Sequence, residues 1–97
     1  MTHAAFALPP LAGVRGSAQQ LTQHLPADSG PVVVECAALL AGTGGYADEL
    51  IRQLLVERHA LSVVFRGLRE PEFRSYLIRQ AAAHGVSDRI AFEEPSA

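Results

Sequence analysis

The spacing of apolar residues changes period repeatedly along the chain. Short apolar runs predict four strands, at residues 4–8, 31–36, 61–67 and 89–93. Stretches in which apolar residues recur at helical spacing predict three helices, at residues 18–25, 46–59 and 71–84. The predicted order of elements is therefore β-α-β-α-β-α-β.

Strands that alternate with helices need crossover connections, and these connections favour parallel pairing. We therefore predict an α/β fold with a small, mostly parallel (mixed) four-stranded sheet and helices packed against its faces. The run at residues 31–36 is apolar enough for a central strand that is buried on both sides. These elements account for nearly all of the chain, which predicts a single domain over residues 1–97.

Particular residues mark the predicted helix ends. Ser17 and Gln20 have the spacing of a capping box, Pro71 suits the first position of a helix, and Gly85 suits a C-terminal cap. The predicted second helix carries polar residues opposite its apolar stripe, and we expect this side to be exposed. These residues are Asp48, Glu49, Arg52 and Gln53.

Composition narrows the classes of function. The formal net charge is −2, and the eight basic residues, all arginine, are dispersed along the chain, which argues against nucleic acid as a partner. No apolar run is long enough to cross a membrane. The only cysteine, Cys36, lies in an apolar run, so we expect a buried core thiol, no internal disulfide and a reducing compartment. A soluble cytoplasmic protein is the expectation.

The stretch AGTGGYADEL at residues 41–50 is rich in glycine between a predicted strand and a predicted helix. A phosphate-binding P-loop is excluded because the chain has no lysine. The run from Gly42 to Ala47 matches the dinucleotide pattern G-x-G-x-x-A, but the preceding strand ends about five residues too early and no acidic residue ends the next strand. We therefore expect no cofactor. Thr43 is predicted to cap the following helix, and the glycines to let the backbone take positive φ and approach another surface closely.

Catalytic chemistry is sparse in the sequence. The four histidines lack the i, i+4 spacing of a metal pair, and one cysteine cannot build a zinc site, so no metal is expected. No serine lies in a nucleophile-elbow pattern. Glu35 ends a predicted buried strand, where a hydrogen-bonding role is expected rather than a catalytic one. The chain is therefore predicted not to be an enzyme.

Several segments together resemble STAS domains, the fold of bacterial anti-sigma-factor antagonists. The similarity lies in a short first strand and helix containing an arginine and small residues (LAGVRGSAQQL), a strand that ends in an acid (VVVE), a glycine-rich loop before an ADEL-like turn (GYADELI), and a final strand, loop and helix (LSVVFRGLREPEFRSYLIRQAAAHGV). The resemblance covers nearly the whole chain. It implies a domain in which the first strand pairs with the second predicted strand and the last two helices share one face.

The STAS resemblance implies a non-enzymatic regulatory domain that binds a protein partner, either a kinase-like anti-sigma factor or another regulator, with a homodimer as a further possibility. In that family a serine at the start of the second helix is phosphorylated by the partner, and this position falls on Gly44. Thr43 is the only hydroxyl nearby, so we expect a constitutive interaction surface without the usual phosphoserine switch. The predicted partner-binding residues are Thr43, Gly44, Gly45, Tyr46, Asp48, Glu49 and Arg52.

A second resemblance is to the nucleotide-sugar-binding domain of two-domain glycosyltransferases. It rests on residues 61–95, where a strand ending in glycine and a helix precede the motif GVSDRIAF at residues 85–92. The basic residues that this family places near its glycine loop are absent, and so is the second half of the domain. This resemblance implies a remnant of such a domain that does not transfer sugar.

Overall fold

A computed structural model describes residues 4–25, 28 and 30–94 of the chain. Its main sheet has four strands in the order β1-β3-β5-β6, and every neighbouring pair is parallel. The strands are β1 (Ala4–Ala7), β3 (Pro31–Glu35), β5 (Ser62–Arg66) and β6 (Ile90–Glu93). The predicted small α/β fold with a mostly parallel four-stranded sheet is confirmed.

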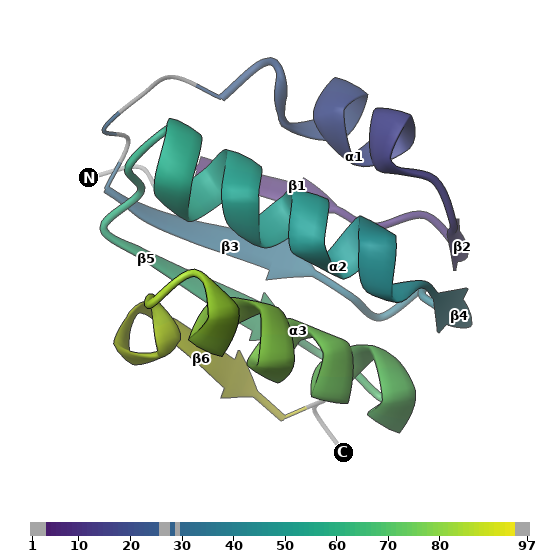
Figure 1. The fold of residues 1–97 in the computed structure, drawn as a ribbon. Coiled ribbons are helices and arrows are strands. Elements are labelled where there is room, and N and C mark those ends of the chain that lie inside the picture. Colours follow the sequence, from purple (N-terminus) through teal and green to yellow (C-terminus); the bar gives the residue numbers. More distant parts are fainter. Residues whose placement is uncertain (1–3, 26–27, 29, 95–97) are drawn as a thin grey trace.

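The helices lie on one face of this sheet (Figure 1). They are α1 (Arg15–Thr22), α2 (Gly44–Ile51) with its π-helical continuation η1 (Arg52–Glu57), and α3 (Pro71–Ala83), and a short turn η2 (Ser87–Arg89) leads into β6. The strand order advances in one direction along the sheet. Because right-handed crossovers are strongly preferred, each successive connection then places its helix on the same side. The central helix, α2, packs against both α1 and α3.

The core lies between the sheet and this helix layer. Val32, Val34, Val63 and Phe65 point to the helices and are fully buried, whereas alternate residues such as Val33 are only half-buried. The prediction that residues 31–36 form a strand buried on both sides is therefore wrong. The long apolar run reflects a central position within the sheet, because no described helix covers the second face.

The predicted helix ends are confirmed at α3 but not at α1. Pro71 begins α3, while Gly85, at φ +71°, and the following Val86 donate backbone hydrogen bonds to the last turn, as in a Schellman motif. Helix α1 begins three residues earlier than predicted, after Val14, which makes no side-chain cap. Ser17 therefore lies inside α1, and the predicted capping box is not formed.

Two short strands that the apolar pattern did not predict join the loops that follow β1 and β3. Strand β2 (Leu11–Ala12) pairs in parallel with β4 (Ala41–Gly42), with Leu11 opposite Ala41. This two-stranded sheet lies beyond the carboxyl ends of the main strands (Figure 1). It fixes the loop before α1 against the loop before α2, so the two loops form one surface.

Glu35 and Cys36 lie at the carboxyl end of β3, where the structure tests a prediction for each of them. Glu35 accepts a hydrogen bond from Arg66 on the neighbouring strand, at 2.9 Å, which confirms its hydrogen-bonding role. Cys36 is buried, its thiol donates to the Val34 carbonyl oxygen at 3.4 Å, and burial raises its pKa to about 12. A thiol with so high a pKa stays protonated at neutral pH, which fits a core residue.

Candidate functional surface at the loops before α1 and α2

Thr43 holds the two loops together at the start of α2. Its Oγ1 accepts a hydrogen bond from the Tyr46 backbone N–H at 3.2 Å, which confirms the predicted N-cap. The same hydroxyl donates to the Gly13 carbonyl oxygen at 2.9 Å. The Thr43 N–H in turn donates to Ala12 at 2.9 Å. Thr43 is exposed, but its hydroxyl already makes two hydrogen bonds within the domain.

The glycines of this loop serve packing rather than unusual backbone angles. None of Gly42, Gly44 and Gly45 has positive φ, so the prediction of positive φ is wrong, whereas the predicted close approach to another surface is confirmed at Gly42. A Cβ added at Gly42 would lie 2.3 Å from the Phe73 ring of α3. At Gly44 the nearest side-chain atom would be 3.9 Å away, in ordinary contact with Tyr76. Gly42 is therefore required by a neighbouring ring, and Gly44 is not sterically restricted.

The predicted partner-binding residues do not form one exposed face. Tyr46 is fully buried and Glu49 is 2% exposed, so neither belongs to an exposed face that a partner protein could contact. The expected exposure of Glu49 was wrong because α2 is the central helix of its layer, and α1 covers the side that the sequence pattern assigned to solvent. Tyr46 belongs to the apolar stripe of α2, which faces the core. Thr43 remains exposed, and Gly44, Gly45, Asp48 and Arg52 are half-buried.

The buried Glu49 carboxylate is bound from several sides. Its Oε2 accepts hydrogen bonds from Gln53 at 2.9 Å, from Gln19 at 3.2 Å and from Arg52, and Arg15 lies 3.6 Å from Oε1. Burial by itself raises the pKa of Glu49, and the hydrogen bonds from Gln53, Arg52 and Gln19 outweigh it, so that the pKa lies below its ordinary value. The carboxylate is an internal link between α1 and α2.

Asp48 forms a second link, which reaches all three helices. Its carboxylate accepts a hydrogen bond from Arg15 of α1 and lies 2.7 Å from Nε2 of His84 at the end of α3. The hydrogen bond from Arg15 holds the pKa of Asp48 below its ordinary value, against the opposing effect of burial and with help from His84. Asp48 is therefore committed to contacts within the domain.

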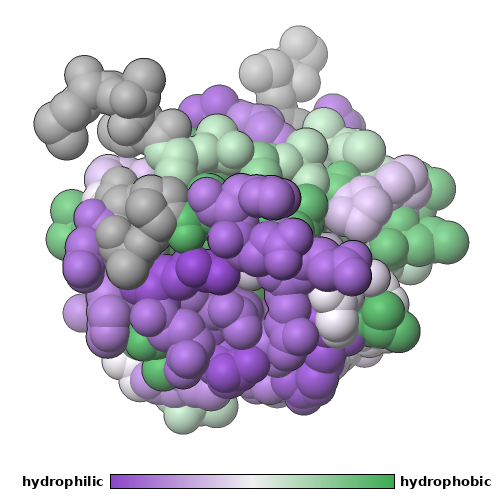
Figure 2. Space-filling view, turned by 90° about the horizontal axis from the view of Figure 1, so that it is seen from above, coloured by the Kyte–Doolittle hydropathy of each residue, from purple (hydrophilic) through white to green (hydrophobic). Residues whose placement is uncertain are grey.

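The loops that Thr43 joins carry exposed apolar side chains that sequence reasoning missed. Leu11, Val14 and Leu40 are 71%, 64% and 73% exposed. In Figure 2, hydrophobic surface gathers at the right-hand edge, the end at which β2 and β4 lie in Figure 1. We call Leu11, Val14, Leu40 and Thr43 the loop surface. Large apolar residues in loops beside the glycines were the signal that could have identified it.

No group of three or more His, Cys, Asp and Glu side chains among the described residues is placed to hold a metal ion. Of the helices in residues 4–25 and 30–94, none combines the length and hydrophobicity that crossing a bilayer requires. Comparisons with protein-family models, curated proteins and solved structures find no match to this chain.

Replacing Thr43 with alanine should lower the free energy of unfolding by about 1 kcal/mol, because the α2 N-cap and the bond to Gly13 are both lost. Thr43→Ser keeps the hydroxyl and should retain most of this stability. Urea denaturation followed by circular dichroism measures the difference. Equal midpoints for Thr43→Ala and wild type would show that the hydroxyl does not stabilise the two loops.

Proposed function

We propose that this chain is a non-enzymatic, STAS-like protein–protein interaction domain that binds a regulatory protein through the loop surface. One observation carries the proposal: Leu11, Val14 and Leu40 are each exposed on the loops before α1 and α2, which are held in place by β2, β4 and Thr43. Large apolar side chains presented on a fixed backbone are typical of protein-binding sites, because little conformational entropy is lost when the partner binds.

The arrangement of the sheet agrees with the STAS-like part of the proposal, and it agrees equally with the 3-2-1 strand order of a Rossmann-like half. The STAS resemblance implies that the first strand pairs with the second predicted strand and that the two later helices share a face. Strand β1 does pair with β3, in register from Ala4 opposite Val32, and α2 and α3 lie on the same side of the sheet (Figure 1). The partner class that follows is a kinase-like anti-sigma factor or another regulator of this kind.

Binding in this proposal does not depend on phosphorylation. Gly44 has no hydroxyl at the position where the family has its regulatory serine, and the Thr43 hydroxyl already makes two hydrogen bonds. A phosphate on Thr43 would remove its donor to Gly13. The loop surface is therefore proposed to be permanently competent to bind.

The test is a quantitative pull-down from a lysate of the source organism with three baits. The wild type is compared with Leu11→Asp/Leu40→Asp, which places charge in the loop surface, and with Leu61→Asp. Leu61 is a matched control because it is 67% exposed but precedes β5, at the opposite end of the strands. We expect a regulatory protein recovered by wild type and Leu61→Asp to fall about tenfold or more with the double variant.

The recovered protein is then purified, and its affinity for each bait is measured by titration calorimetry. Circular dichroism establishes that the three baits are equally folded. The proposal fails if all three recover the same proteins in the same amounts. It fails equally if the purified protein binds wild type and the double variant with the same Kd.

A further inference from the structure

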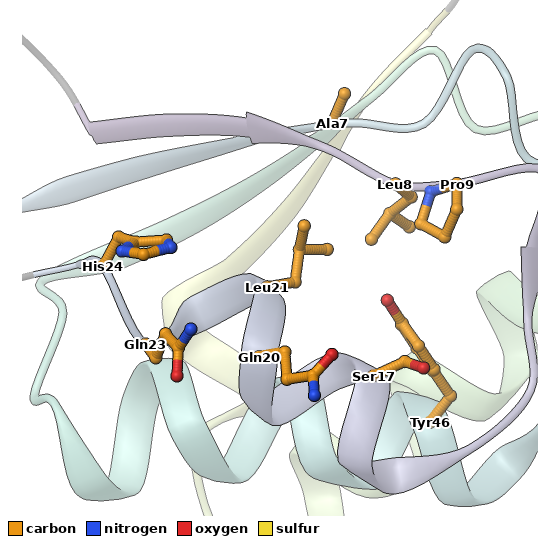
Figure 3. Close-up of a pocket in the computed structure, with 9 residues that line it drawn as sticks. All are labelled: Ala7, Leu8, Pro9, Ser17, Gln20, Leu21, Gln23, His24 and Tyr46. Atoms are coloured by element: carbon orange, nitrogen blue, oxygen red, sulfur yellow. The ribbon is translucent and has the colours of Figure 1, made fainter.

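A pocket of about 590 Å³ lies between the carboxyl end of β1 and helix α1, separate from the loop surface (Figure 3). Leu8 and Pro9 line it on the strand side, and α1 supplies the opposite wall. The residues of the helical wall and the turn after it are Ser17, Gln20, Leu21, Gln23 and His24. The volume is within the range of small-molecule sites.

Tyr46 enters this pocket from below, out of the first turn of α2 (Figure 3). Its side chain is fully buried, with its ring 6.3 Å from that of Phe73. Its hydroxyl has no hydrogen-bond partner among the described residues, and Figure 3 shows it pointing toward the space between Ser17 and Leu8. A buried hydroxyl without a partner is uncommon in folded proteins, because the loss of hydration is not offset.

The tyrosine hydroxyl is available as a donor at neutral pH. Burial raises the pKa of Tyr46 above its ordinary value, so the hydroxyl stays protonated. The strand side adds backbone groups. The Leu8 N–H donates to the Glu35 carbonyl oxygen of β3. Successive residues of a strand direct their backbone groups to opposite sides, so the N–H and C=O of Ala7 point away from β3, toward the unpaired side of β1. The pocket therefore presents donors and acceptors on two walls.

The side chains that line the pocket hold no fixed charge. Ser17, Gln20 and Gln23 are uncharged, neither an arginine nor an acid is among the lining residues, and His24 is the one lining side chain that could pair with an anion. A cationic ligand would lose hydration without gaining a counter-ion, and an anionic ligand has only His24 as a partner, whereas a neutral ligand loses less hydration. The two glutamine amides match a ligand amide in both donors and acceptors. Leu8 and Leu21 supply an apolar contact for its body.

We propose that this pocket binds a small, uncharged, amide-bearing ring compound, whose carbonyl oxygen accepts a hydrogen bond from the Tyr46 hydroxyl while the ring packs against Leu8 and Leu21. This ligand site goes beyond the proposed partner binding and does not depend on it.

The probes are three compounds that share one ring: nicotinamide, pyridine and nicotinate. Titration at pH 7.5 is followed by ¹H–¹⁵N correlation spectra of the full chain. Nicotinamide should shift the amide signals of Ala7, Leu8, Ser17 and Leu21 in a saturable way. Pyridine, which lacks the carbonyl group, and nicotinate, which is charged, should each bind at least about fivefold more weakly.

Tyr46→Phe removes only the hydroxyl and should weaken nicotinamide about five- to tenfold. The melting temperature of this variant should be equal to or above that of wild type, because an unpartnered buried hydroxyl is removed. Tyr76→Phe, on α3, is the matched control and should bind as wild type does. The proposal is overturned if Tyr46→Phe binds equally tightly, if nicotinate matches nicotinamide, or if the shifted signals lie away from the pocket.

Discussion

Replacing Gly42 with alanine is expected to destabilise the protein by about 1 to 3 kcal/mol, a large effect for one methyl group in a loop. A Cβ at this position would lie 2.3 Å from Cδ1 and 2.6 Å from Cε1 of Phe73. The Phe73 ring is fully buried, so it cannot move aside without disturbing the core. Urea denaturation of the variant measures the cost directly.

Two further variants separate this steric explanation from a general effect of losing a loop glycine. Gly44→Ala has space for its methyl group and replaces a poor helix former at the start of α2, so it should be as stable as wild type or more stable. Phe73→Leu provides the second side of a double-mutant cycle. Gly42→Ala should cost clearly less in the Phe73→Leu background. Additive effects would contradict a contact between the two positions.

Glu49→Ala should lower the free energy of unfolding by about 2 to 3 kcal/mol. The carboxylate is almost fully buried, and its removal leaves Gln19, Gln53 and Arg52 without their shared acceptor. We expect a smaller loss of stability than for breaking a fully buried ion pair, because the Arg52 side chain is 34% exposed and can regain water. Thermal and urea denaturation measure the change.

Glu57→Ala is the matched control for this experiment. Glu57 is also paired with Arg52, at 3.7 Å, but its side chain is 54% exposed. Its removal should cost less than about 0.5 kcal/mol, as expected for a surface ion pair. If Glu49→Ala were no more destabilising than Glu57→Ala, the buried network would not contribute to stability.

The hydrogen bonds to Glu49 and Asp48 make the free energy of unfolding depend on pH. Glu49 and Asp48 have folded-state pKa values below their ordinary values of 4.5 and 3.8. A lowered pKa means that the unfolded chain binds the proton more tightly, so the stabilisation is complete above these ordinary values and is lost as the pH falls through the folded-state values. Wild type should therefore lose stability below pH 4.5, and Glu49→Ala should lose less over the same interval.

Sequence periodicity was sufficient for the main elements because each strand and helix has its own local pattern. Pro71 and Gly85 act within their own turn, which is why the ends of α3 could be predicted. Ser17 could not be placed correctly, because a serine three residues before a glutamine fits a cap and also an interior position of α1. The strands β2 and β4 have only two residues each and depend on each other, so no local period indicates them.

The candidate site was harder to predict because exposure depends on neighbours distant in sequence. Glu49 lies on the polar side of an amphipathic helix, and only the packing of α1 against α2 buries it. Tyr46 was counted as a partner contact from its position after the glycines, although its ring belongs to the apolar stripe of the same helix. Thr43 was predicted correctly as a cap because that hydrogen bond spans only three residues.

The uniform direction of the strands also determines how the domain can be attached to a support. All four strands of the main sheet run in the same direction, so their amino ends lie on one side of the domain and their carboxyl ends on the other. Ala4 and Glu93 therefore lie at opposite ends of the domain. The loop surface lies beyond the carboxyl ends of the strands, the side on which β6 also ends. Tethering near Ala4 would thus point Leu11 and Leu40 away from a sensor chip, whereas tethering after Glu93 would bring the same residues close to the matrix.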